Sequence, residues 1–343
     1  TQLTGWMLKH QTPLLVNNFH NDERFKGISE TESHIRSLLS VPMLLKGKMI
    51  GLLTVFNKRS ESNFTPEDQR LLAIISAQSA QVIENARLYK REQDYVRFQE
   101  EMRLAGEIQV NLLPKVEPEI PGYQIAGRSI PAKDVGGDYF DFIEINQGAQ
   151  AGLAVVVGDV SGHGVSSALL MATARALIML RCSMPGEAAG VINDVNRYLS
   201  LDTAQTGNFM TFFYCELSER DRKVRWVRAG HEPAIVYDPS TDAFDELKGQ
   251  GLALGLDDAF EYDSFHRRIE AGQVIMIGTD GIWEMRNQAG EMFGKEALLE
   301  IIRNNYTASA RQIVDTVTEA LEQFRGDDAP EDDITLVVIK VVR

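Results

Sequence analysis

An apolar run from Leu153 to Val157 ends abruptly in a loop of glycines that carries one carboxylate, Gly158-Asp159-Val160-Ser161-Gly162-His163-Gly164. A run of this length followed by glycines is typical of a buried strand that ends in a tight turn. A helix-like segment, Ser166 to Leu180, begins directly after the loop. The pattern therefore predicts that Asp159 is held at the tip of a buried strand.

Three further carboxylate sites have the same strand-end context: Thr279-Asp280-Gly281 after the run from Gln273, Gly136-Gly137-Asp138 before Tyr139 to Ile145, and Asp332-Asp333 before Ile334 to Val342. An Asp beside Gly, taken alone, is most simply a turn residue. Four such sites, far apart in sequence, converge only if their strands lie side by side. Carboxylate oxygens suit Mg²⁺ or Mn²⁺, whereas zinc favours His and Cys. We therefore expect a hard-cation site that activates water.

These segments also carry a family resemblance. The stretches Gly136 to Asp141, Gly158 to Gly164, Thr279 to Gly281 and Asp332 to Thr335 resemble the ordered motifs of the metal-dependent protein phosphatases (PPM, type 2C), in the bacterial SpoIIE/RsbU branch. The helix Arg103 to Pro114 and the segment Ala229 to Pro233 resemble the same branch. The resemblance covers roughly residues 100 to 343.

The resemblance implies an α+β fold, a PPM-type α/β/β/α sandwich with the metals at one edge. It implies two Mn²⁺ or Mg²⁺ ions that share a water held by Asp138 and Asp159, with Asp159 bridging and the Val160 carbonyl adding an oxygen. Asp280 and Asp332 would complete the ligand set of one metal ion. Asp333 stands where many relatives have Asn, so the register within the doublet is open and Asp333 also remains a candidate ligand.

Two positions depart from the eukaryotic type 2C pattern. Lys133 stands where those enzymes have a phosphate-binding Arg, and a Lys acts as a point charge rather than a bidentate fork. Ser161 stands where they have His, and the histidine comes at His163 instead. The general acid is therefore open, because His163 is also interpretable as a loop residue that satisfies local backbone groups. His231 has the same structural interpretation, as a turn residue between strands.

The implied reaction is hydrolysis of a phosphoserine or phosphothreonine on a signalling protein. Within this branch the implied substrate is a STAS-type anti-anti-sigma factor. Two alternatives stay open at this point. The same phosphatase can act in another pathway, or the chain can be a catalytically silent docking module whose metal site only shapes a surface.

Length and composition bound these interpretations. The 343 residues favour two domains, and 44% apolar with 24% charged residues is typical of a globular chain with a sizeable core. The net charge of −14 argues against a nucleic-acid or anionic-membrane surface. Cys182 and Cys215 lie in apolar segments and lack a disulfide-pairing motif, so we expect two buried free thiols. We find no apolar stretch of membrane-spanning length and expect a cytoplasmic protein; since the chain starts at Thr1, we expect a piece of a longer one.

Residues 1–88 read as an α/β domain. Pro13 to Val16, Ser37 to Leu45 and Met49 to Phe56 predict strands, the last two joined by a hairpin. The segment resembles the C-terminal part of a GAF sensor domain and implies a truncated domain that binds a small ligand or a partner. Asn57, Lys58, Phe64 and Asp68 resemble a pattern of cyclic-nucleotide GAF domains that is also common in GAF domains without nucleotide, where Lys58 and Asp68 simply pair.

A long helix follows, with Thr65 as N-cap and Pro66 at its first position. Nothing but Gly106 interrupts the helical pattern before Pro114, and residues 89–113 read as a helical linker. Its heptad-like stripe is Leu71, Ile75, Val82, Tyr89 and Val96. This stripe favours a parallel homodimeric coiled coil, while a single helix packed on its own domain is a close rival because several seam positions are polar.

The remaining residues, 119–343, follow a loop of helix breakers and predict the phosphatase-like domain. Strands are expected at 123–130, 139–145, 153–157, 208–217, 222–229, 234–238 and 260–269, and helices at 166–180, 185–199, 294–303 and 309–324. Runs of strands alternating with runs of helices favour the α+β class. Trp283 and Phe293 are expected in the core.

Overall fold

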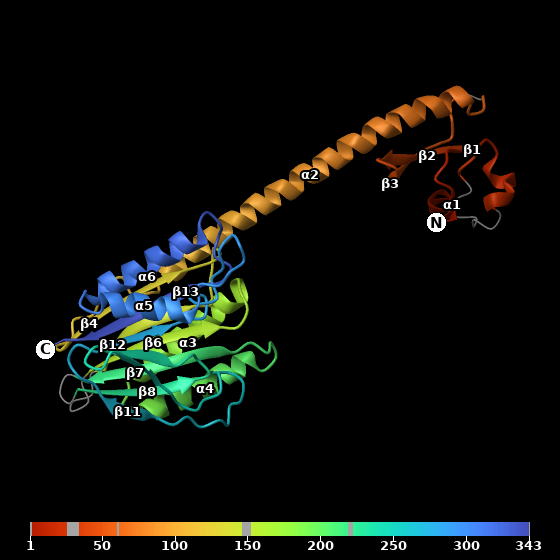
Figure 1. The fold of residues 1–343 in the computed structure, drawn as a ribbon. Coiled ribbons are helices and arrows are strands. Elements are labelled where there is room, and N and C mark those ends of the chain that lie inside the picture. The colour runs from red at the N-terminus through yellow and green to blue at the C-terminus, as the bar shows by residue number, and fades with distance from the viewer. Residues whose placement is uncertain (1, 26–33, 60–61, 146–151, 219–221, 343) are drawn as a thin grey trace. The chain divides into compact units, whose positions relative to one another are not determined.

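The computed structural model describes residues 2–25, 34–59, 62–145, 152–218 and 222–342. These residues form two compact units, Thr1–Gln99 and Glu100–Arg343. Figure 1 shows the elements of each unit.

The first unit contains a three-stranded antiparallel sheet in the order β1-β2-β3. Its elements are α1 (Gln2–His10), β1 (Leu14–Val16), η1 (Phe19–Asn21), η2 (Glu23–Phe25), β2 (Leu38–Leu45), β3 (Lys48–Phe56) and the start of α2 (Pro66–Val110). The expected hairpin is present, and both residues of its turn, Lys46 and Gly47, have positive φ as a two-residue turn requires. Sequence patterns did not predict α1.

Helix α2 begins as expected, with the Thr65 hydroxyl accepting a hydrogen bond from the Asp68 N–H. Its inner face packs Leu72 against Leu39 and Val41 of the sheet, and the Ser76 hydroxyl donates to the Pro42 carbonyl. The heptad-like stripe lies on another face, where its five residues are 42–67% exposed. Packing on its own domain therefore does not explain the stripe.

The second unit contains two five-stranded antiparallel sheets. One has the order β10-β9-β12-β13-β4 and the other β11-β8-β7-β6-β5. The strands are β4 (Tyr123–Ile130), β5 (Tyr139–Ile145), β6 (Gly152–Val160), β7 (Met210–Ser218), β8 (Lys223–Ala229), β9 (Ala234–Asp238), β10 (Ala243–Leu247), β11 (Phe265–Arg268), β12 (Val274–Gly278) and β13 (Ile334–Val341), and the helices are α3 (Val165–Cys182), α4 (Ala188–Thr203), α5 (Lys295–Asn305) and α6 (Ala310–Arg325).

Three apolar clusters lie between the four layers of the sandwich. Strand β6 contributes to two of these clusters, one on each of its faces, which explains why its sequence is apolar throughout. Leu153, Val155 and Val157 face the other sheet, while Ala154 and Val156 face helices α3 and α4. The third cluster joins the outer face of the β12-β13 sheet to α5 and α6 (Figure 1). The expected α/β/β/α sandwich is confirmed.

Several boundaries differ from the sequence-based predictions. Strand β6 continues through Asp159 and Val160, whereas the expected strand 260–269 is reduced to β11. Residues before β11 are instead held by α4, where the Asn193 side chain accepts from the Tyr262 N–H. Strand β10 was not predicted, and α2 ends at Val110 rather than Leu113.

By length and mean hydropathy, 1.4, helix α3 could cross a membrane, but serine, threonine and arginine residues interrupt its apolar sequence. Six of its residues are buried, including Met171 and Ile178, and they pack against β5, β6 and α4. This buried face accounts for part of the apolar composition, whereas Leu169 and Leu180 are exposed. Cys182 on this helix and Cys215 on β7 are both buried free thiols, as expected.

Candidate metal centre

The four expected aspartate sites lie at the ends of neighbouring strands. Asp138 directly precedes β5, and Asp159 is the penultimate residue of its partner β6. Asp280 follows β12 by one residue, and Asp332-Asp333 precedes the adjacent strand β13. Both pairs of strands therefore deliver carboxylates to one edge of the sandwich, between its two sheets.

Asp159 has the clearest electrostatic signature. Burial, followed by the negative charges of Asp280, Asp332 and Asp333, raises its pKa to about 7. Burial also raises the pKa of Asp280, with a contribution from Asp332. Because neighbouring aspartates raise the pKa values of Asp159 and Asp280, these carboxylates lie close enough to repel one another. None of the five aspartates forms an ion pair within the described residues.

Asp138 is buried, and its pKa is raised well above the ordinary value by burial and by the charge of Asp159. Its carboxylate accepts a hydrogen bond of 2.9 Å from the Thr279 hydroxyl. The same hydroxyl accepts from the Thr335 backbone N–H at 2.9 Å. Thr279 therefore orients Asp138 from the opposite sheet, a role that sequence patterns did not reveal although Thr279 lies in the Thr279-Asp280-Gly281 motif.

The two members of the C-terminal doublet are placed differently. Asp333 turns its carboxylate onto the segment before β5, where it accepts from the backbone N–H groups of Ala132 at 2.8 Å and Gly137 at 2.7 Å. Asp332 is exposed and, among the residues that the structure describes, accepts only from the Asp333 N–H. A Cβ on Gly136 would lie 2.3 Å from the Asp333 carboxylate, so this close approach requires glycine.

Lys133 and His163 are exposed and line one small cavity of about 150 Å³ together with Asp332 and Asp333. The structure therefore brings both residues to the aspartate edge. A second cavity of about 240 Å³ shares Asp332 and is lined by Gly281, Glu284, Met285 and Arg286 among others. The Val160 carbonyl oxygen lies beside Gly137, the residue before Asp138, since a Cβ on Gly137 would lie 2.8 Å from it.

The donor set fits a hard cation in its chemistry but is not closed around one. Oxygen atoms from carboxylates and one carbonyl are the ligands that Mg²⁺ and Mn²⁺ prefer. In the described part of the chain, no three His, Cys, Asp or Glu side chains already form a metal-binding group. The raised pKa values of Asp138, Asp159 and Asp280 show a negative charge that a cation would relieve.

His231 lies behind this edge, on the turn between β8 and β9, and is only 3% exposed. Its Nδ1 is 2.8 Å from the Thr211 hydroxyl, and Thr211 is the cross-strand neighbour of Asp159. Burial lowers the pKa of His231 to about 4. The ring is therefore neutral and structural, as expected. Trp283 and Phe293 are half-buried beside α5 and α6, at the margin of the core.

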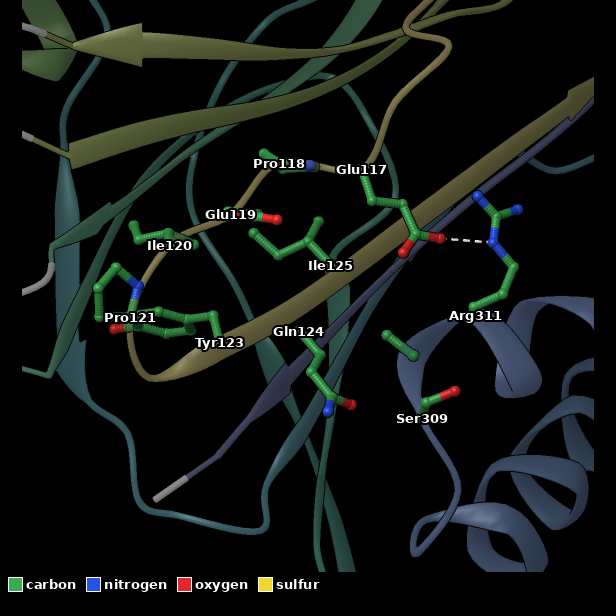
Figure 2. A pocket seen from close by; sticks show the side chains of 11 residues that line it. Glu117, Pro118, Glu119, Ile120, Pro121, Tyr123, Gln124, Ile125, Ser309 and Arg311 are labelled. Carbon is green, nitrogen blue, oxygen red and sulfur yellow. Dashed lines mark hydrogen bonds and ion pairs between the residues drawn. The ribbon is translucent and has the colours of Figure 1, made fainter.

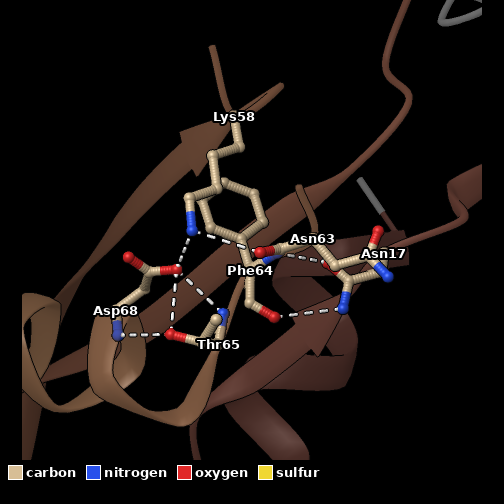
Figure 3. Close-up of polar contacts among 6 residues, drawn as sticks. All are labelled: Asn17, Lys58, Asn63, Phe64, Thr65 and Asp68. Atoms are coloured by element: carbon tan, nitrogen blue, oxygen red, sulfur yellow. Dashed lines mark hydrogen bonds and ion pairs between the residues drawn. The ribbon is translucent and has the colours of Figure 1, made fainter. Parts of the chain in front are cut away.

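The nucleotide-like motif of the first unit forms a closed structural network (Figure 3). Lys58 donates to Asp68 at 2.5 Å and to the Asn63 carbonyl at 3.1 Å, and the Asn17 side chain brackets the backbone of Phe64. The Asp68 carboxylate also accepts from the Thr65 N–H. These groups satisfy one another, which favours pairing over the cyclic-nucleotide interpretation.

Figure 2 shows a larger cavity, about 710 Å³, at the far end of β4 from the aspartates. It is lined by the connector Glu117 to Pro121, by Tyr123 to Ile125 at the start of β4, and by Ser309 to Arg311 at the start of α6. Arg311 crosses it to pair with Glu117. Besides that pair, Glu119 is the only charged residue in the lining. The cavity therefore lacks a cluster of carboxylates like the one at the aspartate edge, and we do not assign it as the reaction site.

The sandwich and its aspartate edge define a PP2C-type phosphatase domain, which follows a GAF-like unit. Comparison with known families agrees: the family "Stage II sporulation protein E (SpoIIE)" matches residues 149–342, and the GAF domain family matches residues 1–84. The SpoIIE match spans more than half of the chain. The chain belongs to the SpoIIE family.

Individual relatives are distant. Phosphoserine phosphatase RsbU of Bacillus subtilis (strain 168) is 26% identical over 240 residues, which are 70% of each chain. Protein IcfG of Synechocystis sp. is 27% identical over 269 residues, covering 70% of this chain but 41% of IcfG. Among solved structures, the SiaA-PP2C domain of Pseudomonas aeruginosa has a TM-score of 0.60 at 20% identity, covering 72% of this chain and 98% of that domain. This likeness supports the fold.

Proposed function

We propose that the chain is a metal-dependent protein serine/threonine phosphatase. The observation that carries the proposal is the convergence of Asp138, Asp159, Asp280 and Asp332 at one edge, with pKa values raised in the first three and no ion pair to any of the four within the described residues. A silent docking module has no need to hold buried, mutually repelling carboxylates. RsbU, the relative covered over 70% of its length, is named a phosphoserine phosphatase.

The residues that would hold two Mn²⁺ or Mg²⁺ ions are Asp138, Asp159, the Val160 carbonyl, Asp280 and Asp332. We assign Asp332 rather than Asp333, because both oxygens of Asp333 already accept backbone hydrogen bonds. When bound, such ions supply a water whose pKa falls from about 15.7 towards about 7, so that it attacks phosphorus at neutral pH.

The chain's own residues then orient and neutralise the phosphate. Lys133 lines the cavity beside Asp332 and supplies a single positive charge for the phosphate oxygens. His163 lines the same cavity, which supports a role for it as the acid that protonates the leaving serine oxygen. Thr279 keeps Asp138 oriented by donating its hydroxyl hydrogen to the carboxylate. No covalent enzyme intermediate is needed.

We further propose a substrate and a mode of control. The substrate is a phosphoprotein of a signalling pathway, a STAS-type anti-anti-sigma factor, in keeping with the similarity to RsbU. Control comes through the GAF-like unit, which senses a small ligand or a partner, and through α2. A second copy of the chain covers the exposed stripe of α2, which gives a parallel homodimer. The protein acts in the cytoplasm.

The test is phosphate release from a phosphoserine peptide by the wild-type chain and by Asp159→Asn, with Mn²⁺, Mg²⁺ or EDTA. We expect release that requires metal and is lost in the variant. Full activity of Asp159→Asn with metal would refute the mechanism. If no metal supports activity, calorimetric titration with Mn²⁺ separates an enzyme that binds metal but awaits its activator from a docking module that binds none.

A further inference from the structure

The C-terminal turns of α2 lie directly on the segment that leads into Asp138. The Gln109 carboxamide Nε2 donates to the Gly136 carbonyl at 2.7 Å, and its Oε1 accepts from the Gly136 N–H at 3.0 Å. One side chain thus satisfies both backbone polar groups of the residue two positions before Asp138. Side-chain pairs of this kind fix a loop backbone as a neighbouring strand would.

Gly106, one turn before Gln109, brings the helix backbone close enough for this contact. A Cβ at Gly106 would lie 1.9 Å from the Asp134 carbonyl oxygen, a distance that no side chain permits. Gly106 is also the one residue that interrupts the helix-forming pattern of α2, at a cost of about 1 kcal/mol relative to Ala. Close approach to residues 134–136 explains why a glycine stands there.

A second attachment lies just beyond the end of the helix. The Arg175 guanidinium on α3 donates to the Leu112 carbonyl at 2.8 Å and lies 3.5 Å from the carboxylate of Asp141 on β5. Asp141 is buried and also accepts from the Tyr139 hydroxyl. The end of α2 is therefore tied to the strand segment on both sides of Asp138.

The opposite side of the segment is held by β13, through the hydrogen bonds from Ala132 and Gly137 to Asp333. Gln109 and Asp333 thus hold the segment between them by side-chain contacts to its backbone. Of these two side-chain contacts, the one from Asp333 comes from the sheets, because Asp333 directly precedes β13. The Gln109 contact comes from α2, the helix that begins in the GAF-like unit at Pro66.

We propose that Gln109 is a positioning residue for the metal site: its carboxamide sets the place of Gly136 and, through it, of Asp138. The affinity of the site for its metals then depends on whether the end of α2 is seated on residues 134–136. This inference rests on the proposed function and names the contact through which α2 acts on the site.

The variant that tests it is Gln109→Leu, which keeps the volume and helix propensity but removes both hydrogen bonds. Gln323→Leu is the matched control, because Gln323 is exposed on helix α6, outside α2, and its side chain forms no hydrogen bond within the described residues. Three readouts apply: amide hydrogen exchange of residues 132–138 in metal-free protein, calorimetric Mn²⁺ affinity, and phosphatase activity against Mn²⁺ concentration. Thermal unfolding confirms that each variant folds.

For Gln109→Leu we expect faster exchange at Gly136 and Asp138 and a Mn²⁺ affinity weaker by roughly 10- to 100-fold, as for other residues that orient metal ligands. Excess Mn²⁺ should restore most of the activity of Gln109→Leu. The Gln109→Glu side chain can still accept from the Gly136 N–H, so its Mn²⁺ affinity should lie between those of the wild type and Gln109→Leu. Gln323→Leu should match the wild type in all three readouts.

Wild-type exchange and wild-type Mn²⁺ affinity in a folded Gln109→Leu protein would overturn the inference. The exchange and calorimetry readouts need no catalysis, so they decide the role of Gln109 even if the wild-type chain proves inactive. Lack of activity in the wild type, with normal metal binding that still depends on Gln109, would instead count against the proposed reaction alone.

Discussion

The two units each gather acidic side chains beside a turn, but the surroundings have opposite effects on them. In the first unit, hydrogen bonding to Lys58 and to the Thr65 backbone lowers the pKa of Asp68. In the second, burial and neighbouring carboxylates raise the pKa of Asp159 to about 7. Both motifs resemble ligand sites in sequence. A carboxylate whose partners come from its own unit is part of the scaffold, whereas carboxylates that repel one another need a cation from outside.

The largest expected effect contrasts one aspartate from each unit. Asp280→Asn should lower metal-dependent phosphatase activity by more than about 100-fold, because loss of a direct ligand should exceed the cost of losing a residue that only orients one. Asp68→Asn should leave activity within about twofold. Steady-state phosphate release at saturating Mn²⁺ checks both. A comparable loss in the two variants would abolish the distinction between the two sites.

A smaller effect is expected from the hydroxyl that orients Asp138. Thr279→Val keeps the shape of the side chain but removes its hydrogen bonds to Asp138 and the Thr335 N–H. We expect Mn²⁺ affinity to fall by roughly 10-fold, at the low end for such residues. Thr316→Val is the control, since its hydroxyl bonds only within α6. Calorimetry measures both, and equal affinities would show that Thr279 serves packing alone.

The smallest effect concerns pH and stability without metal. Because the pKa of Asp159 rises from 3.8 to about 7 on folding, the folded protein binds a proton between these values that the unfolded chain has released. The contribution of Asp159 to stability should therefore fall as pH rises through this window. His231, whose pKa is lowered from 6.5 to about 4 on folding, contributes in the opposite direction, so the Asp159 contribution is measured as the difference between the wild type and Asp159→Asn. In EDTA we expect the melting temperature of the wild type, relative to that of Asp159→Asn, to be about 3–8 °C higher at pH 5 than at pH 7.5.

The same measurement separates the two units. Asp68, whose pKa is lowered on folding, loses its stabilising contribution only as pH falls below 3.8, outside the window. Asp159→Asn should therefore lack the Asp159 contribution between pH 5 and pH 7.5, and saturating Mn²⁺ should stabilise the wild type more at pH 7.5. Identical pH profiles for the metal-free wild type and metal-free Asp159→Asn would contradict the electrostatic account of the site.

Sequence patterns predicted the sandwich and its aspartate edge because both depend on local signals. The apolar run of β6 and the glycines beside Asp159 are readable from consecutive residues, and so is the capped start of α2. The boundaries that were wrong depend on distant partners. The expected strand 260–269 is shortened because Asn193 of α4 binds the backbone of Tyr262, a contact 69 positions away in sequence.

The candidate site divides in the same way. Types of metal ligand follow from spacing and chemistry, but the residues that orient them do not. Gln109 bonds Gly136 across 27 positions, and Thr279 bonds Asp138 across 141. Nothing in the residues around Gln109 or Thr279 indicates these partners. The distinct placements of Asp332 and Asp333 likewise required the position of the segment at Ala132.

The position of β13 has a consequence for how the protein is made. This strand lies inside its sheet, between β12 and β4, and Asp333 at its start bonds Ala132, 201 positions earlier. While a ribosome is still translating the residues before β13, strand β4 has no sheet neighbour among the described strands already made. Contacts of such sequence separation form slowly. A nascent chain therefore exposes the edge of β4 to chaperones or to aggregation until β13 has been made.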